Sequence, residues 1–124
     1  MIVGLGIDII EVERVKEKIL KNVGFKTKVF SASEIAYCDS FGEQKYQHYA
    51  ARFAAKEAFL KATGKGLQLS HDLHEIEVII NNKGKPGISL SKELMESPAL
   101  HNRIHVSLSH LSATACAVVV LETI

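Results

Sequence analysis

The chain has 124 residues, the length of one ordinary domain, and its composition does not change along its length in a way that would indicate a second domain. Its 15 Lys and Arg residues nearly balance 14 Asp and Glu residues, and the formal net charge of +1 argues against a nucleic-acid-binding or membrane-surface protein. The apolar start lacks a basic leader and a cleavage site, while Cys38 and Cys116 lack the spacing of a disulfide framework or a zinc site. We therefore expect one domain, residues 1–124, in the cytoplasm.

The N-terminal segment is predicted to run from a strand directly into a helix. Residues 2–7 are rich in β-branched and apolar types, which is typical of a buried strand, and from Ile9 to about Leu20 apolar residues recur at helical spacing. Asp8 lies between the two, where a buried carboxylate is costly unless it has a partner. Two interpretations stay open: Asp8 forms a helix capping box with Glu11, or it binds a cation or a metal ion.

Alternate residues of a strand share a face, so Gly4, Gly6 and Asp8 would lie together on one side of the first strand. The apolar residues between them would point to the opposite side. Because glycine has no side chain, another backbone or a ligand can approach the first face closely.

Two further helices are predicted in the first half of the chain. Ser31 or Ser33 can act as the N-cap of a short helix near residues 32–40. Residues 45–63 contain no Gly or Pro, are rich in Ala and repeat apolar residues at helical period, and Gly64 then supplies a C-terminal stop. This segment predicts one long helix.

The second half of the chain is predicted to form two hairpins. HEIEVIINN alternates around Ile76, Val78 and Ile80, and NKGKPG supplies a turn before the extended ISL. RIHVSLSH and ATACAVVVL form a second hairpin, preceded by SKELMESP as a short helix or irregular link. Helices in the first half and strands mostly in the second predict an α+β fold, with a largely antiparallel sheet packed against the long central helix and the shorter N-terminal-half helices.

Phe53, Glu57 and Lys61 recur every four residues on the long predicted helix and so point the same way. One interpretation is an ordinary surface ion pair between Glu57 and Lys61, which stabilises a helix by about 0.2–0.5 kcal/mol. The alanines around Glu57 favour a second interpretation, in which another surface approaches closely and half buries the carboxylate. A carboxylate in that setting needs a partner.

The segment HVSLSH would place His105, Ser107 and Ser109 on one face of a strand. Three hydrogen-bonding side chains in a row suit the recognition of a phosphate or a hydroxyl group. A half-exposed sheet face has the same pattern, so this alternative stays open. His110 would fall on the apolar side unless the strand ends there.

Three segments together resemble the holo-acyl-carrier-protein synthase family, the small bacterial phosphopantetheinyl transferases. In chain order they are GIDIIEVERV at 6–15, RFAAKEAFLKATGKG at 52–66 and HVSLSH at 105–110. They match the pattern of that family in order and spacing over essentially the whole chain. FSASEIAYC at 30–38 and EIEV followed by GKP at 84–86 agree as well.

The resemblance implies transfer of phosphopantetheine from coenzyme A to a serine of apo-acyl carrier protein, with release of adenosine 3',5'-bisphosphate, in support of fatty acid biosynthesis. It assigns Asp8 and Glu57 to a magnesium ion and places Lys61 beside the phosphates as a point charge. Magnesium is usually held by one or two carboxylates together with substrate phosphates, so these residue types fit the ion. Glu57 would also take the serine proton, directly or through a water.

The matching motifs also imply which residues contact coenzyme A. These are Lys61, Lys85, Pro86, His105, Ser109 and His110. Short members of the family act as trimers with sites between subunits. A homotrimer would therefore place Asp8 and Glu57 on one protomer and the HVSLSH or GKP groups on its neighbour.

Carrier proteins are acidic, so the resemblance implies a basic docking surface. Arg14, Lys18 and Lys21 on the first predicted helix would form it. An ordinary solvated helix face is the alternative for the two lysines.

Two other functions stay open on the sequence alone. A metal-independent coenzyme A user, such as an acyltransferase, would leave the pairing of Asp8 with Glu57 unexplained. In a non-catalytic trimeric binding module, Asp8 would only cap a helix and Glu57 would only pair with Lys61.

Overall fold

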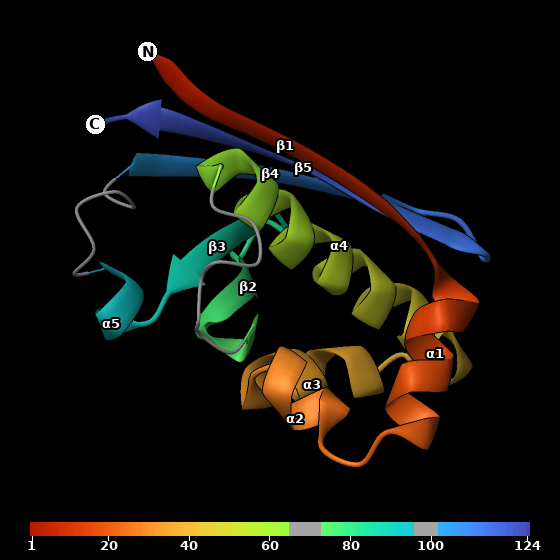
Figure 1. The fold of residues 1–124 in the computed structure, drawn as a ribbon. Coiled ribbons are helices and arrows are strands. Elements are labelled where there is room, and N and C mark those ends of the chain that lie inside the picture. Colours follow the sequence, from red (N-terminus) through yellow and green to blue (C-terminus); the bar gives the residue numbers. More distant parts are fainter. Residues whose placement is uncertain (65–72, 96–101) are drawn as a thin grey trace.

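The computed structural model describes residues 1–64, 73–95 and 102–124 (Figure 1). In chain order its elements are β1 (Ile2–Glu11), α1 (Val12–Lys21), α2 (Phe25–Val29), α3 (Ala32–Asp39), η1 (Gly42–Gln44), α4 (Lys45–Thr63), η3 (Leu73–Glu75), β2 (Ile76–Ile80), β3 (Pro86–Leu90), α5 (Lys92–Met95), β4 (Asn102–His110) and β5 (Thr114–Thr123). Both η elements are short 3-10 helices. The predicted α+β fold class is confirmed.

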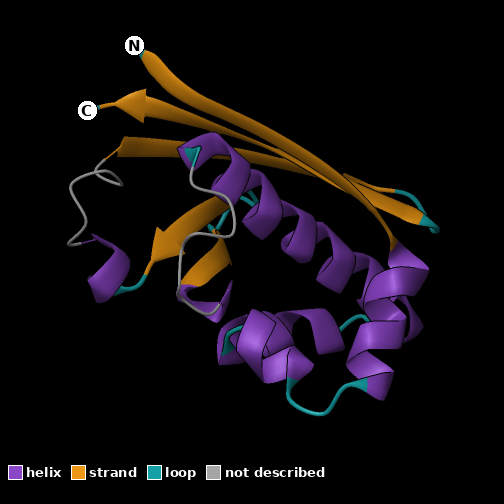
Figure 2. Cartoon of the chain, viewed as in Figure 1, coloured by secondary structure: helices purple, strands orange, loops and turns teal. Residues whose placement is uncertain are grey.

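Two antiparallel sheets surround the long helix α4. The three-stranded sheet has the order β1–β5–β4 and runs along the length of α4, and the β2–β3 hairpin packs beside β4 and against α4. The helices α1, α2 and α3 gather around the N-terminal half of α4 (Figure 2). Both predicted hairpins are therefore present. None of the helices in the described ranges is long and apolar enough to cross a membrane.

The two later helices of the first half begin and end as their sequence signals predict. Ser31 is the N-cap of α3, and its side chain and that of Glu34 form a complete capping box. The 19-residue helix α4 ends at Gly64, which has the left-handed backbone conformation (φ 74°) that glycine adopts without steric cost.

The prediction for the start of the chain was wrong in two respects. The first strand continues to Glu11, and the helix begins at Val12 rather than Ile9, because residues 9–11 pair with β5 as far as Glu11 and Thr114. Asp8 consequently lies inside β1 and caps no helix, and the side chain of Glu11 makes no capping hydrogen bond. The short helix α2 had not been predicted.

The glycine face of β1 packs directly on α4. A Cβ atom at Gly6 would overlap the carbonyl oxygen of Ala58, and one at Gly4 would overlap that of Ala62. Only glycine fits at these two positions while the strand keeps this distance from the helix. The close approach expected from the alternation of Gly4, Gly6 and Asp8 is therefore present.

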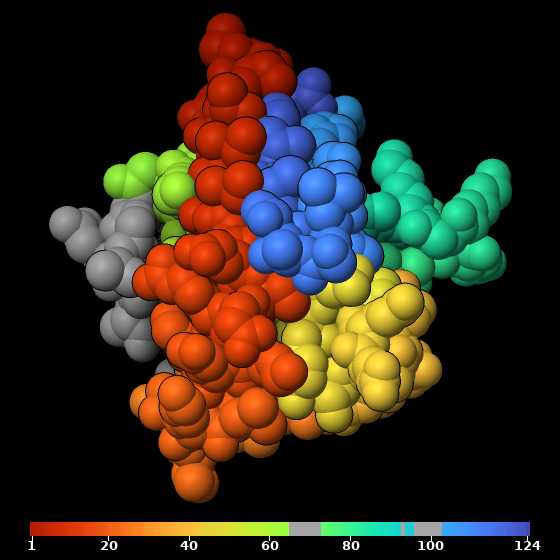
Figure 3. Space-filling view, turned by 90° about the vertical axis from the view of Figure 1, so that its right-hand side faces the viewer, coloured from red at the N-terminus to blue at the C-terminus, as the bar shows by residue number. Residues whose placement is uncertain are grey.

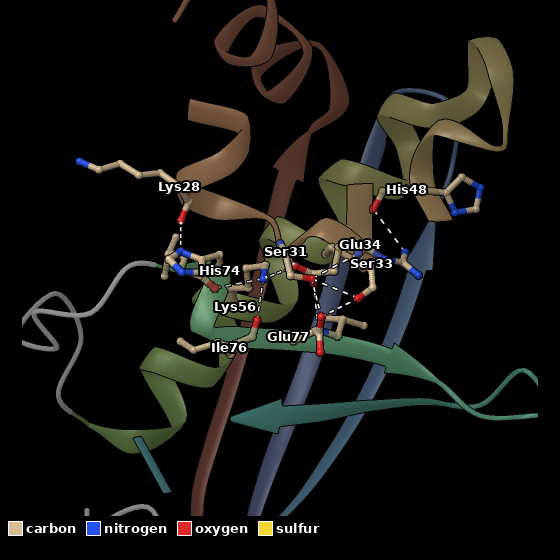
Figure 4. A network of polar contacts seen from close by, with 12 residues as sticks. Lys28, Ser31, Ser33, Glu34, His48, Lys56, His74, Ile76 and Glu77 are labelled. Carbon is tan, nitrogen blue, oxygen red and sulfur yellow. Dashed lines mark hydrogen bonds and ion pairs between the residues drawn. The ribbon is translucent and has the colours of Figure 1, made fainter. Parts of the chain in front are cut away.

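A buried ion pair fixes the opposite side of α4 (Figure 4). Lys56 donates hydrogen bonds to the carboxylate of Glu34 (2.8 Å) and to the backbone carbonyls of Leu73 and Ile76 (3.1 and 2.6 Å). Glu34 also accepts backbone N–H groups from the start of α3 and from Val78 in β2 (2.9 Å each). Both side chains are inaccessible to solvent, and all three ammonium protons of Lys56 have acceptors. The pair therefore ties α4 to α3 and β2.

The face of the three-stranded sheet that points away from α4 is apolar and exposed. Val3, Leu5, Ile7 and Ile9 of β1 are 50–70% exposed, although the sequence had predicted a buried strand. Figure 3 shows β1 beside the β4–β5 hairpin on this side of the molecule, with α1 directly below. Exposed apolar strands of this length normally mark an interface.

Substitution of Lys56 by Met is expected to lower the free energy of unfolding by about 3–5 kcal/mol, because it leaves the carboxylate of Glu34 buried without its counter-ion. Chemical denaturation followed by circular dichroism measures this loss. Lys26→Met is the control, since Lys26 forms a half-exposed ion pair with Asp39 that contributes about 1 kcal/mol or less. If the two variants lost equal free energy of unfolding, the expectation that the buried pair matters more than the half-exposed one would be contradicted.

Candidate active site

The contact between β1 and α4 brings together charged side chains from the C-terminal half of the helix and from the first strand. The ammonium group of Lys61, in the last turn of α4, lies 3.1 Å from the Asp8 carboxylate and donates to the backbone carbonyl of Ile7 (3.0 Å). Asp8 lies on the face of β1 that Gly4 and Gly6 bring against the helix. Lys61 therefore pairs with Asp8, and not with Glu57 as the surface-pair interpretation required.

Glu57 lies one helical turn before Lys61 and is half buried. Burial raises the pKa of its carboxyl group, and the negative charge of Asp8 raises it further, while Lys61 and Lys18 act in the opposite direction. Asp8 therefore lies close enough to Glu57 for its negative charge to disfavour the ionised form of Glu57. Such a pair is a suitable place for a cation.

The donor set fits magnesium better than zinc. Asp8 and Glu57 supply only carboxylate oxygens, and the described residues contain no group of three His, Cys, Asp or Glu side chains that could enclose an ion. Mg²⁺ is commonly held by one or two carboxylates, and waters and substrate phosphates complete its shell. A structural zinc site needs four protein ligands.

Two of the other sequence-predicted residues lie on the opposite face of the sheet. His105 and Ser109 pair with Val120 and Cys116 of β5 and share the exposed outer face with the apolar residues of β1. The imidazole of His105 lies 3.1 Å from the carboxylate of Glu122. Within one chain, the sheet itself separates these two residues from Asp8 and Glu57.

The remaining predicted contacts gather at the other end of β4. His110 is the last residue of that strand, is exposed, and lies 3.0 Å from the amide oxygen of Gln47. His110 and Pro86 line the same open pocket, together with His48 and Arg52 of α4. Lys85 precedes Pro86 in the β2–β3 turn. His110 and Pro86, which lie far apart in the sequence, therefore meet at one hollow.

Arg52 is a candidate that the sequence patterns missed. Its side chain is buried, its guanidinium carbon lies 4.2 Å from the ring centroid of Tyr37, and Nη1 donates to the backbone carbonyl of His48 (3.4 Å). Its Nε has no hydrogen-bond partner, and none of the carboxylates in the described residues forms an ion pair with it. A buried guanidinium without a counter-ion at the edge of a pocket is a candidate site for an anion.

A cationic environment around Arg52 also affects its neighbour His48. Burial lowers the pKa of His48 to about 4, and the nearby His110 and Arg52 contribute to this shift. His48 is therefore neutral at pH 7, and its ring stacks on that of Phe41 with 3.7 Å between the centroids. The pocket is thus lined by the aromatic rings of Tyr37 and His48 and by the cation of Arg52.

The three basic residues of α1 differ in their surroundings. Arg14 and Lys21 are exposed, whereas Lys18 is half buried. All three line one shallow pocket with Glu17 and Asn22. A basic surface is thus present on α1, and it borders the middle of α4 at Phe53.

Known proteins resemble the chain in both sequence and fold. Residues 4–119 match the 4'-phosphopantetheinyl transferase superfamily. The chain is 44% identical over 126 residues to the holo-[acyl-carrier-protein] synthase of Cytophaga hutchinsonii, covering 98% of each chain. It is 48% identical over 123 residues to that of Ruminiclostridium cellulolyticum, covering 95% of this chain and 90% of the relative.

Two solved structures bind the nucleotide that the motifs imply. The holo-(acyl-carrier-protein) synthase of Bacillus anthracis in complex with CoA (3',5'-ADP) has a TM-score of 0.83 and 35% identity, covering 100% of this chain and 99% of that one. The Helicobacter pylori holo-[acyl-carrier-protein] synthase in complex with coenzyme A has a TM-score of 0.80 and 34% identity, covering 95% and 99%.

Asp8→Asn is expected to lower the pKa of Glu57 in the metal-free protein, because it removes the negative charge that raises this pKa. Carbon-13 NMR titration of the Glu57 carboxyl group measures the change. Glu122→Gln, on the outer sheet face, serves as the control and is expected to leave the pKa of Glu57 unaltered. An unchanged Glu57 titration in Asp8→Asn would show that the two carboxylates do not converge.

The raised pKa of Glu57 also makes the stability of the metal-free protein depend on pH. Because the folded-state pKa of Glu57 is raised, its contribution to stability is present below the unfolded-state pKa and is lost as the pH rises through the folded-state value. At pH 7 the ionised carboxylate of Glu57 therefore destabilises the metal-free protein. Glu57→Gln is expected to raise the melting temperature of the metal-free protein.

Proposed function

The chain belongs to the holo-[acyl-carrier-protein] synthases of the 4'-phosphopantetheinyl transferase superfamily, and from this membership we propose that Asp8, Glu57 and Lys61 form its catalytic centre. The enzyme transfers phosphopantetheine from coenzyme A to apo-acyl carrier protein, a step that supports fatty acid biosynthesis. The convergence of the two carboxylates with Lys61 carries the assignment. The superfamily match, which extends over residues 4–119, supports a single catalytic domain.

Asp8 and Glu57 would hold a magnesium ion, since their oxygen donors and mutual repulsion fit a cation with few protein ligands. A bound magnesium ion supplies positive charge to the diphosphate and to the departing phosphate. Lys61, held by Asp8, adds a fixed cation on the same side. The described residues thus match a negatively charged substrate.

Glu57 is the proposed acceptor of the proton from the serine hydroxyl of the carrier protein. The serine oxygen of the carrier forms a bond to the phosphorus that bears pantetheine, and the bond from that phosphorus to the bridging oxygen breaks. Adenosine 3',5'-bisphosphate leaves with the bridging oxygen. A half-buried carboxylate is a suitable proton acceptor for the serine hydroxyl, directly or through a water.

The pocket at the end of β4 would receive the nucleotide of coenzyme A. Pro86 and His110 line it, and the unpaired guanidinium of Arg52 offers a phosphate its missing counter-charge. Lys85 precedes Pro86 in the turn and adds a second cation at the rim. His105 and Ser109, on the outer sheet face, are the proposed contacts for the phosphates.

A homotrimer with sites between subunits accounts for the two separated groups of residues. His105 and Ser109 lie on one face of the sheet and the carboxylates on the other, so one chain cannot use both on one substrate. The exposed apolar residues of β1 on the outer face offer a surface for a neighbouring copy. A second chain placed there would bring its own residues to the substrate.

The basic surface of α1 is the proposed docking site for the acidic carrier protein. Arg14 and Lys21 are exposed there, and Lys18 lies between them toward α4. Complementary charge accelerates the encounter and orients the carrier. The cytoplasm is the proposed location of the reaction.

Incubation with coenzyme A, Mg²⁺ and an apo-acyl carrier protein is expected to add one phosphopantetheine group to each carrier, measured by intact mass spectrometry. Chelation of the divalent cation is expected to stop the reaction. Glu57→Gln should lower the rate by about 100- to 10,000-fold, because it removes both a metal ligand and a proton acceptor. Glu43→Gln, at an exposed carboxylate in η1, is the control. An unchanged carrier mass, or full activity of Glu57→Gln, would refute the assignment.

Ile7→Lys tests the trimer, because Ile7 is 65% exposed in the middle of β1 on the outer face and the substitution would place a charge in the proposed interface. Light scattering coupled to size exclusion is expected to show the mass of a trimer for the wild type and of a monomer for the variant, with loss of transfer. Ile79→Lys is the matched control, since Ile79 is exposed on β2, away from the outer face. A trimer that persists in Ile7→Lys would place the interface elsewhere.

A further inference from the structure

Lys18 differs from the other basic residues of α1 in what its ammonium group contacts. It lies 5.5 Å from the ring centroid of Phe53 and 5.9 Å from that of Phe25. The two rings are themselves packed, with 6.2 Å between their centroids. Lys18 is therefore held against α4, whereas Arg14 and Lys21 are exposed to solvent.

The position of Phe53 on α4 places Lys18 at the edge of the proposed catalytic centre. Phe53 precedes Glu57 by one helical turn, a rise of about 6 Å, and Lys61 follows Glu57 by the same interval. The ammonium groups of Lys18 and Lys61 thus lie toward opposite sides of Glu57 along the helix.

We propose that Lys18 contacts the phosphate that is transferred, opposite Lys61, in addition to bordering the surface where the carrier docks. The proposal rests on the function proposed above. Its basis is the geometry of the aromatic contacts, which hold the ammonium group of Lys18 against Phe25 and against Phe53, one helical turn before Glu57 on α4.

Charge balance gives this contact a chemical role. As the phosphoryl group passes between the two oxygens, its negative charge spreads over the oxygens that are not being exchanged. Lys61 already forms an ion pair with Asp8, so part of its positive charge is balanced by that carboxylate. Among the described residues, no carboxylate lies within ion-pairing distance of Lys18, and its ammonium protons are free to contact a phosphate oxygen. An aromatic ring attracts a cation without neutralising its charge.

The decisive experiment compares coenzyme A with adenosine 3',5'-bisphosphate. Coenzyme A contains the transferred phosphate and the pantetheine attached to it, whereas adenosine 3',5'-bisphosphate lacks both. Lys18→Met removes the charge while its side chain still packs on the two rings. By calorimetry without added metal, Lys18→Met is expected to weaken coenzyme A binding by about tenfold, the loss of one charge-assisted hydrogen bond. Binding of adenosine 3',5'-bisphosphate is expected to change less than twofold.

Steady-state kinetics separate this role from docking. Lys18→Met is expected to lower kcat by about 10- to 100-fold, and Lys18→Arg to recover part of the loss because it restores a cation. Lys21→Met is the matched control on the same helix, and it is expected to raise the KM for the carrier and leave the affinity for coenzyme A unchanged.

The outcomes are distinct from those that test the overall function. If Lys18→Met raises only the KM for the carrier and binds coenzyme A as the wild type does, Lys18 is a docking residue and the proposal is overturned. If it weakens both nucleotides equally, the contact is not with the transferred phosphate and the proposal is again overturned. Failure of the wild type to modify a carrier would instead refute the function itself.

Discussion

The close packing of β1 on α4 is the constraint on which the candidate site depends. At Gly4 and Gly6 the strand backbone lies against carbonyl groups of the helix, and any side chain there would push the strand away. Asp8 follows on the same face of the strand. The approach that the glycines permit therefore also brings the Asp8 carboxylate to Lys61 and into the electrostatic range of Glu57. Without this approach the acidic residues would be two unrelated surface charges.

The rotation of α4 about its own axis is fixed from the opposite side. Lys56 and Glu57 are consecutive and, because successive helical residues point in different directions, one can be anchored while the other faces the site. Lys56 has three acceptors in α3, η3 and β2 (Figure 4). Burial of such a pair adds little net stability when compared with apolar residues of the same size. The ion pair between Lys56 and Glu34 instead fixes the orientation of α4, and so determines which side of the helix meets β1.

The sequence predicted the elements whose signals are local. The capping box of α3, the glycine that ends α4 and both hairpin turns each lie within a few residues of the element that they define. The junction between β1 and α1 could not be predicted in this way, because residues 9–11 fit a helix and a strand equally, and their pairing with β5 at the other end of the chain decides between them. Arg52 was missed for a similar reason. It follows an alanine-rich helical pattern, and its burial depends on the packing of Tyr37 and His48 around it.

The alternation of side chains along the strands divides the proposed site between two faces of one sheet. In β1 the even positions carry Asp8 toward α4, and in β4 the odd positions carry His105 and Ser109 away from it. A substrate that contacts both groups cannot reach them through a paired sheet. In the proposed homotrimer the second group would come from another copy of the chain, and the exposed apolar residues of β1 would form the surface against which that copy packs. Packing of the copies on this apolar surface would then bring the two groups of proposed site residues together.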